Sequence, residues 1–319
     1  MLRVLVTRLA SSVAVFLLIA VGLFALVRLA PGDPIDMMVP PEVSGADREA
    51  YTAAVRERYG LDQPIVVQFV RWFGGLLSGD LGYSYTNGQP VGELLVDRLG
   101  PTALLMGSAL LIGLIIAVPA GVIAAVRRNT VADYTISTVS VVAISVPSFF
   151  LGMLAIYVFA VKLHVLPSAG MHGPGRDGLG DLLLHMVLPV GLLALANAAS
   201  FIRYVRSGVL EELGKDYVRT IIAKGGTPAR ALRHALRNSL MSLITVLAMA
   251  IPVTLSGAVV LEQIFAWPGM GQLAIYALTN RDYPILIGFG LYTALLVLIC
   301  NLIADLSYSI IDPRVRTAQ

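Results

Sequence analysis

Six long stretches of this 319-residue chain contain no charged residue, and they constrain its fold more than any other feature. A helix that crosses a bilayer needs about 20 consecutive, mostly apolar residues. Charged residues make up only 13% of the chain, about half the share typical of soluble domains. The pattern predicts an all-α integral membrane protein with six transmembrane helices. They cover Leu9–Val27, Thr102–Val126, Thr135–Val161, Met186–Ile202, Ser239–Leu261 and Pro284–Ala304.

The first stretch has two interpretations, a membrane helix or a cleaved signal peptide. The apolar region of a signal peptide usually has only about 7–15 residues and ends in small residues. Leu9–Val27 is longer and is followed by Arg28, which favours an uncleaved helix. A polar excursion follows it, with helical patterning over Glu49–Tyr59 and Pro64–Leu77. The second helix is amphipathic, and Trp72 and Phe73 are either interfacial anchors or part of an outer contact face.

The placement of lysine and arginine predicts the orientation in the membrane. Fourteen of the 23 basic residues lie at the two termini, in the short loop at Arg127-Arg128 and in residues 203–238. Cytoplasmic loops carry such an excess. We therefore expect cytoplasmic termini and four regions: residues 1–29 with the first helix, 30–98 outside, 99–310 as the membrane core with a cytoplasmic segment at 208–239, and 311–319 as a cytoplasmic tail.

The cytoplasmic segment Leu210–Leu240 contains two helical runs joined at Gly225-Gly226. Thr227 suits the N-cap of the second run and Pro228 its first position. The residues that point to a docking function are Arg219, Lys224, Gly225, Gly226, Thr227, Pro228, Arg230, Arg233, His234 and Arg237. The segment is either a helix that docks on a soluble partner or a basic loop that touches anionic lipid, and the residues alone leave both open. A DNA-binding helix-turn-helix is disfavoured because a membrane helix follows directly.

Several chemistries are absent from the sequence. One cysteine permits no internal disulfide, and four scattered histidines do not form a metal-binding motif. The chain also lacks the Gly-x-x-x-x-Gly-Lys-Ser/Thr loop that cradles nucleotide phosphates. We expect no catalysis, no cofactor and no metal on this chain, and no nucleic-acid partner.

Small polar residues and prolines in the predicted spans are candidates for a passage through the membrane. Pro147 and Pro252 are expected to interrupt their helices and free carbonyl groups. The alternative, ordinary packing between helices, also favours Ser and Thr and stays open. For Glu262, at the end of a span, a hydrogen bond between helices is favoured over ion coupling. The candidates are Ser145, Pro147, Ser148, Asn197, Ser200, Pro252, Thr254, Ser256 and Glu262.

Several motifs in order along the chain carry a family resemblance. Gly225-Gly-Thr-Pro228, within the fuller string Asp216–Asn238, resembles the EAA loop of ABC importer permeases. The other matching stretches are Ala30–Pro34, Tyr59–Pro64, Leu77–Gly82, Arg98–Thr102, Val260–Gly271 and Ile311–Arg314. Together they are similar to the first permease subunit of dipeptide, oligopeptide and nickel importers. The chain departs from the EAA pattern at Arg219-Thr220-Ile221 and lacks the closing leucine-proline at Ser239-Leu240-Met241.

The resemblance implies a type I, MetI-like permease of a prokaryotic cytoplasmic membrane that imports peptides. A second homologous permease, two ATPase subunits that bind ATP and Mg²⁺, and an external substrate-binding protein would be its partners. The docking helix Thr227–Arg237 would transmit ATPase motion, and Trp267, Pro268 and Gly269 would lie on the outer rim facing the binding protein. The alternatives are import of nickel or another small solute and, from a different class, a stand-alone channel or secondary carrier.

Overall fold

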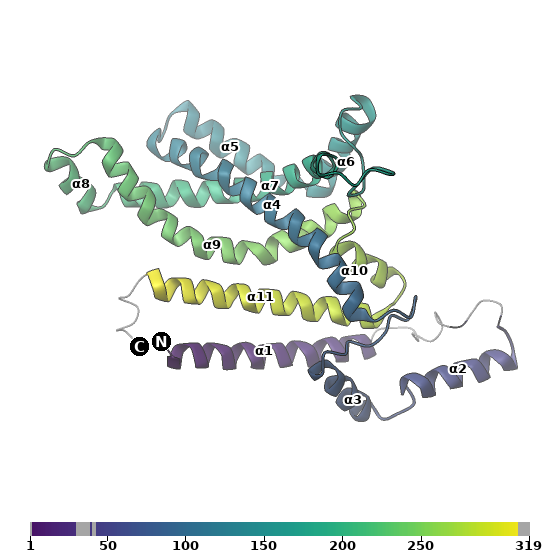
Figure 1. Ribbon diagram of the computed structural model, residues 1–319. Helices are drawn as coiled ribbons and strands as arrows, with labels where there is room; N and C mark the ends of the chain where they lie inside the picture. Colours follow the sequence, from purple (N-terminus) through teal and green to yellow (C-terminus); the bar gives the residue numbers. More distant parts are fainter. Residues whose placement is uncertain (1, 30–38, 40–42, 312–319) are drawn as a thin grey trace. The chain divides into compact units, whose positions relative to one another are not determined.

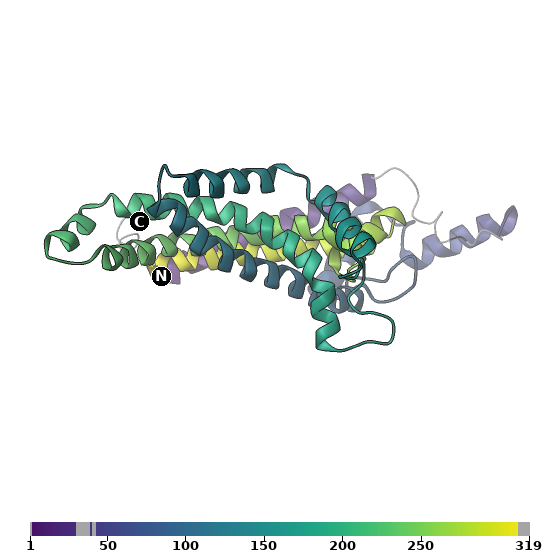
Figure 2. The same ribbon diagram turned by 90° about the horizontal axis from the view of Figure 1, so that it is seen from above.

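The computed structural model describes residues 2–29, 39 and 43–311, and the regular secondary structure of this part is helical apart from one isolated bridge between Tyr83 and Pro90 (Figures 1 and 2). The Ala30–Pro34 motif and the tail from residue 312 lie outside the described residues. The elements are α1 (Leu2–Leu29), α2 (Ala46–Tyr59), α3 (Ile65–Leu77), α4 (Val91–Val126), α5 (Val131–Ser145), α6 (Ser148–Ala155), the π-helix η2 (Ile156–Lys162), α7 (Leu179–Leu213), α8 (Asp216–Ala223), α9 (Pro228–Ile264), α10 (Met270–Thr279) and α11 (Tyr283–Ile311).

Five of the described helices are long and apolar enough to cross a membrane: α1, α4, α7, α9 and α11. Each contains one of the predicted stretches, and each extends beyond it. Both predicted helices of the polar excursion are also present, as α2 and α3. The apolar patterning of the sequence therefore identified the membrane helices and the type of fold.

The third predicted span, Thr135–Val161, is interrupted at Pro147, as the sequence predicts. One half is α5, and the other half is α6 together with η2. The two halves are bent by 95° at a short break. Pro147 causes the break because it disfavours helical geometry at the residue before it. Val146 accordingly has an extended backbone with ψ of 127°. A sixth crossing exists only if this bent pair is one span.

The expectation that Pro252 interrupts the fifth span is wrong. Helix α9 runs without a break from Pro228 to Ile264, with Pro252 inside it. A proline in a helix removes one backbone hydrogen bond and kinks the chain, but buried residues on the following turns, Leu255 and Ala258, hold this helix together. The chain also lacks a proline near Ser239 that could end the docking helix. The candidate docking helix therefore continues into the fifth span, and the two form one helix.

The described chain divides into two compact units. The first consists of residues 102–268 and 299 onward, and α7 packs along α9 in it. Small residues bring these helices and α4 close together: an added Cβ at Gly121 would lie 2.7 Å from Cβ of Val205, and one at Gly208 would lie 3.2 Å from Cβ of Ser239. Close packing through small residues is typical of membrane helices.

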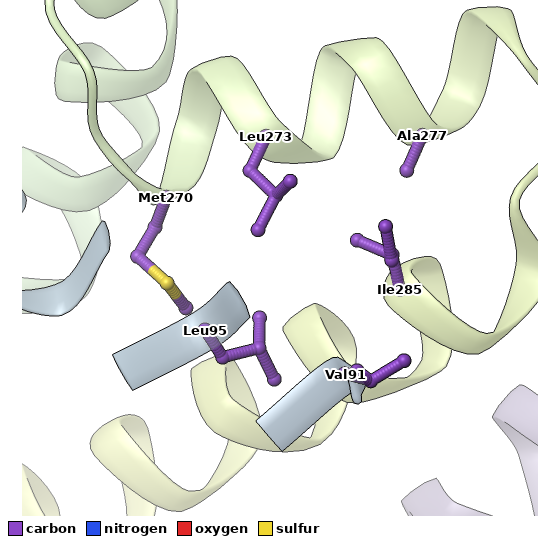
Figure 3. Packing of buried hydrophobic residues seen from close by; sticks show 6 residues of the cluster. All are labelled: Val91, Leu95, Met270, Leu273, Ala277 and Ile285. Carbon is purple, nitrogen blue, oxygen red and sulfur yellow. The ribbon is translucent and has the colours of Figure 1, made fainter. Parts of the chain in front are cut away.

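The second unit consists of residues 2–101 and 269–298. In one part of its core, Met270, Leu273 and Ala277 of α10 face side chains of α4 and α11 (Figure 3). Helix α10 had no counterpart among the predicted elements. In another part, Trp72 of α3 is half-buried against a cluster that contains Ala20 and Leu291. Its ring also lies 5.4 Å from that of Phe24, so Trp72 contributes to the core of this unit.

A buried carboxyl group joins distant parts of the second unit. Asp282, fully buried at the start of α11, accepts hydrogen bonds at Oδ2 from Oγ of Ser84 (2.5 Å), Oγ1 of Thr86 (2.6 Å) and the backbone N–H of Thr86 (3.1 Å). Most buried polar groups are hydrogen-bonded; here Oδ2 carries all of these bonds, and Oδ1 has no partner among the described residues. These bonds fix the turn after α3 to the α10–α11 corner; we call them the Asp282 knot.

Candidate functional site

The turn between α8 and α9 needs glycine at two successive positions for different reasons. Gly225 has φ of +79°, in the left-handed region that favours glycine. At Gly226 there is no room for a side chain, because an added Cβ would lie 2.6 Å from Cγ2 and 2.7 Å from the carbonyl oxygen of Ile221. The backbone N–H of Gly226 donates to that same oxygen at 2.9 Å. The turn is therefore closed tightly onto the end of α8.

Helix α9 begins as the sequence predicts. Thr227 is its N-cap, Pro228 is at its start, and Oγ1 of Thr227 accepts from the backbone N–H of Arg230 at 3.3 Å. Ala231 and Ala235 are buried, whereas the remaining candidate side chains of the first turns are exposed. The exposed group consists of Arg230, Arg233, His234 and Arg237. The first turns of α9 thus pack by one apolar stripe and present a basic face.

Helix α8 carries the other two candidates, and both are exposed. Val218 is the buried residue of this short helix. Arg219 lies 3.6 Å from Asp216 in an ion pair whose side chains are 80% and 96% exposed, so that pair contributes little stability. Lys224, at the end of α8, is also exposed. The candidate coupling residues therefore lie together around one turn.

Glu212 holds this region together, and the sequence analysis did not identify it. At the end of α7 it binds Nζ of Lys215, Oη of Tyr217 (2.7 Å) and Nδ2 of Asn238 (3.3 Å). The hydrogen bond to Glu212 raises the pKa of Lys215. Burial raises the pKa of Tyr217, and its hydrogen bond to Glu212 adds to the shift. We call these contacts the Glu212 clasp, because they tie α7, α8 and α9 to one carboxylate.

A second carboxylate supports the same segment from α5. Asp133 receives two hydrogen bonds from Arg206, from Nε at 2.6 Å and from Nη2 at 2.7 Å. Its Oδ2 also accepts the backbone N–H of Asn129 at 3.0 Å. Paired, bidentate contacts of this kind are among the stronger side-chain interactions. Arg206 was one of the basic residues in the sequence pattern, but no local signal pointed to Asp133, 73 positions away.

The structure brings together two of the nine candidate passage residues by a direct hydrogen bond. Oγ1 of Thr254 in α9 donates to Oδ1 of Asn197 in α7 at 3.0 Å. Nδ2 of Asn197 is buried and has no hydrogen-bond partner among the described residues. Gly113 of α4 adjoins this pair, since an added Cβ there would lie 3.0 Å from Cβ of Asn197. Three helices thus meet at a polar point with a spare donor.

The other passage candidates are dispersed. Oγ of Ser145 donates to the carbonyl of Val141 at 2.8 Å, and Oγ of Ser256 donates to that of Pro252 at 3.4 Å. These hydroxyls bond within their own helices. Ser148 and Ser200 are half-buried, and Pro147 is exposed.

Glu262 has the contact expected between helices. Its carboxylate accepts a hydrogen bond from Oγ1 of Thr102 at 2.6 Å, and its side chain is 0% exposed. The family resemblance implies that Trp267 lies on the outer rim. In the structure its side chain is also 0% exposed. Of its two neighbours on the expected outer rim, Gly269 is buried and Pro268 half-buried. The indole is packed inside because large aromatic side chains gain more from burial than from a surface position.

The arrangement consists of exposed charges and paired carboxylates. Within the described residues no group of three His, Cys, Asp or Glu side chains is placed to hold a metal ion. His172 and His185 each lie 3.6 Å from Asp181 through Nδ1, and these histidines pair with a carboxylate. What the site offers is an exposed basic helix start that is continuous with a membrane helix and is bonded to Glu212 through Asn238.

Comparisons with known proteins agree with this geometry. The family of "binding-protein-dependent transport system inner membrane component" matches residues 117–317, and the family of its N-terminal region matches residues 1–106. A putative peptide permease protein of Brucella ovis is 41% identical over 319 residues, 99% of each chain. The oligopeptide transport system permease protein AppB of Bacillus subtilis is 39% identical over 98% of each chain. The dipeptide transport system permease protein DppB of Escherichia coli is 34% identical over 99% of each.

A solved structure shows the same fold. The MetNI methionine ABC transporter, in an inward-facing conformation, aligns with a TM-score of 0.51 and 19% identity over 68% of this chain and 94% of that chain. The membrane helices, the glycine turn, and family matches that together reach from residue 1 to residue 317 lead to one conclusion. The chain belongs to the family of binding-protein-dependent transport system inner membrane components, the permease subunits of ABC importers.

Proposed function

We propose that this permease imports peptides, driven by ATPase subunits that dock on the first turns of α9. A second, homologous permease completes the membrane passage, two ATPase subunits bind ATP and Mg²⁺, and a substrate-binding protein delivers cargo. Both termini are cytoplasmic in this proposal, residues 30–98 are extracytoplasmic, residues 99–310 form the permease core, and residues 311–319 are a cytoplasmic tail. The chain itself catalyses no reaction and supplies the path and the mechanical link.

The observation that carries the docking role is the exposed basic face at the start of α9. Residues Arg230, Arg233 and Arg237 recur at helical spacing on a helix that continues to Ile264. A push on this face is transmitted along one rigid element into the membrane core. The Glu212 clasp and the Gly225-Gly226 turn hold α8 against that helix, so the segment can move as a body.

Peptide cargo is supported by the printed names of the three full-length relatives, each of which is a peptide, oligopeptide or dipeptide permease. These names favour peptides over nickel or another small solute. The polar point at Asn197 and Thr254 supports a neutral path, because an amide can hydrogen-bond a peptide backbone without selecting side chains. Membership in an ABC importer family also argues against a stand-alone channel or secondary carrier.

A charge reversal in the docking face tests the proposal. In proteoliposomes with the full transporter, Arg233→Glu should lower ATP-driven peptide uptake at least about tenfold, because reversing one interfacial charge opposes binding of the partner. Membrane insertion should be normal. The matched control is Arg128→Glu, an exposed arginine in the short loop after α4, which should keep near-normal uptake. Unchanged uptake in Arg233→Glu, or uptake by the permease without ATPases, would refute the docking role.

A further inference from the structure

A pocket of about 270 Å³ lies within the second unit, at the ends of two membrane helices. Phe24 and Val27 line it from the last turns of the apolar part of α1, Val6–Val27. Tyr283 and Ile287 line it from the start of the apolar part of α11. The corner between α2 and α3 and the turn after α3 close the other sides. The pocket thus lies where apolar spans meet the polar excursion, the depth of a bilayer interface.

The lining combines an apolar base with one cation. Aromatic side chains, among them Trp72, Tyr83 and Tyr283, line the pocket, and Arg71 is the charged residue among the described residues that line it. Arg71 packs over Gly60, where an added Cβ would lie 2.6 Å from Nη1. Within the part of the chain that the structure describes, Arg71 has no ion pair or side-chain hydrogen bond. The guanidinium of this exposed side chain therefore has its donors available for an anion at the pocket.

We propose that this pocket binds a membrane phospholipid, with the phosphate on Arg71 and the start of an acyl chain against Phe24, Val27 and Ile287. Arginine matches phosphate oxygens in a bidentate fashion, and tryptophan and tyrosine are enriched where headgroups lie. The volume is below the range of about 300–1,000 Å³ for sites that enclose a whole ligand. A lipid fits this limit because most of its chain stays in the bilayer.

The chemistry also argues against a free peptide in this pocket. A peptide bound by both ends would need an anionic group for its ammonium terminus, and none of the described residues that line the pocket carries a carboxylate. The occupant we expect carries a negative charge next to an apolar body. A phospholipid at the end of two spans would brace α3 against α1 and α11, so it would act as a structural ligand of the second unit.

Native mass spectrometry of the full transporter, extracted in mild detergent, tests this proposal. We expect one phospholipid to remain bound to the permease, and Arg71→Gln to weaken its retention about tenfold, as for loss of a charged hydrogen bond. Val67→Phe, which fills the pocket from an exposed position on α3, should also displace the lipid while keeping Arg71. The matched control, Arg56→Gln on the exposed surface of α2, should retain it.

Three results would overturn the proposal. Equal lipid retention in Arg71→Gln and the unmodified protein would show that the cation does not hold the phosphate. Displacement of the lipid by inorganic phosphate alone would assign the pocket to a free anion. Displacement by an excess of mixed dipeptides would assign it to a peptide. The Arg233→Glu variant should retain the lipid, so failure of this inference and failure of the docking role are separate outcomes.

Discussion

The turn that leads into α9 and the Asp282 knot are both tight, polar and essential to local geometry, yet they are specified in opposite ways. The α8–α9 turn uses residues within a few positions of each other: Gly225, Gly226 and a cap at Thr227. The Asp282 knot joins residues 198 positions apart in the chain. The local sequence specifies the α8–α9 turn, whereas the Asp282 knot forms only when the chain has folded.

This difference in origin predicts a difference in behaviour. A substitution in the local turn should change the backbone of that turn and leave the surrounding packing intact. The Asp282 knot should fail as a unit, because removing its acceptor leaves the buried hydroxyl of Ser84 and both donors of Thr86 without their shared partner. The Glu212 clasp is intermediate, since it joins neighbours in α8 and a more distant residue in α9. Substitutions at four positions measure this contrast.

The largest effect is expected for Asp282→Ala. The substitution removes the acceptor of the buried Ser84 hydroxyl and of the hydroxyl of the exposed Thr86, and should lower the local opening free energy by about 3 kcal/mol. Amide hydrogen exchange should accelerate about a hundredfold at Ser84 and Gly88, whose N–H groups bond within this turn. Amides of α9 should be unaffected. Asp282→Asn, which keeps one acceptor, should lose less, and equal exchange in all three proteins would disprove the anchoring role.

An intermediate effect is expected at the two glycines. Gly226→Ala must displace the backbone of Ile221 and should destabilise the turn by about 2 kcal/mol, as overpacking does. Gly225→Ala has open space around it and should lose only about 1 kcal/mol, from its left-handed backbone. Retention of ATPase subunits during purification reports both. The reverse order would show that backbone conformation, rather than space, limits this turn.

The smallest effect is expected for Thr227→Ala. Loss of an N-cap costs about 0.5–2 kcal/mol in helices, and here the long α9 remains anchored by buried residues farther along. Fraying should be confined to the first turn, seen as faster exchange of the Arg230 amide. Thr227→Ser should restore the cap. If Thr227→Ala also disturbs the Glu212 clasp, the two features form one cooperative unit and the contrast drawn here is too strong.

Much of the fold was predictable because its signals are local. Long apolar runs predicted α1, α4, α7, α9 and α11, and the turn residues predicted the start of α9. Helix α10 was missed because the proline and glycines at Pro268–Gly271 suggest a turn. Its apolar residues are recognised as a core face only when they are seen packed against α4 and α11 (Figure 3). For the candidate site, the basic residues were identified, but their supports Glu212 and Asp133 were not.

Two prolines show most clearly what could not be predicted from the sequence. Pro147 and Pro252 look alike in the sequence, each in an apolar run flanked by small polar residues. One breaks its helix, with a 95° bend, and the other lies in a continuous helix. By itself, the sequence determined that this chain crosses a membrane, which residues form the basic turn, and which family it resembles, because these depend on hydrophobicity and local backbone preference. Only the tertiary structure decided which proline bends, that Trp267 and Glu262 are buried, and that Asp282 holds the turn after α3, because each depends on partners distant in the chain.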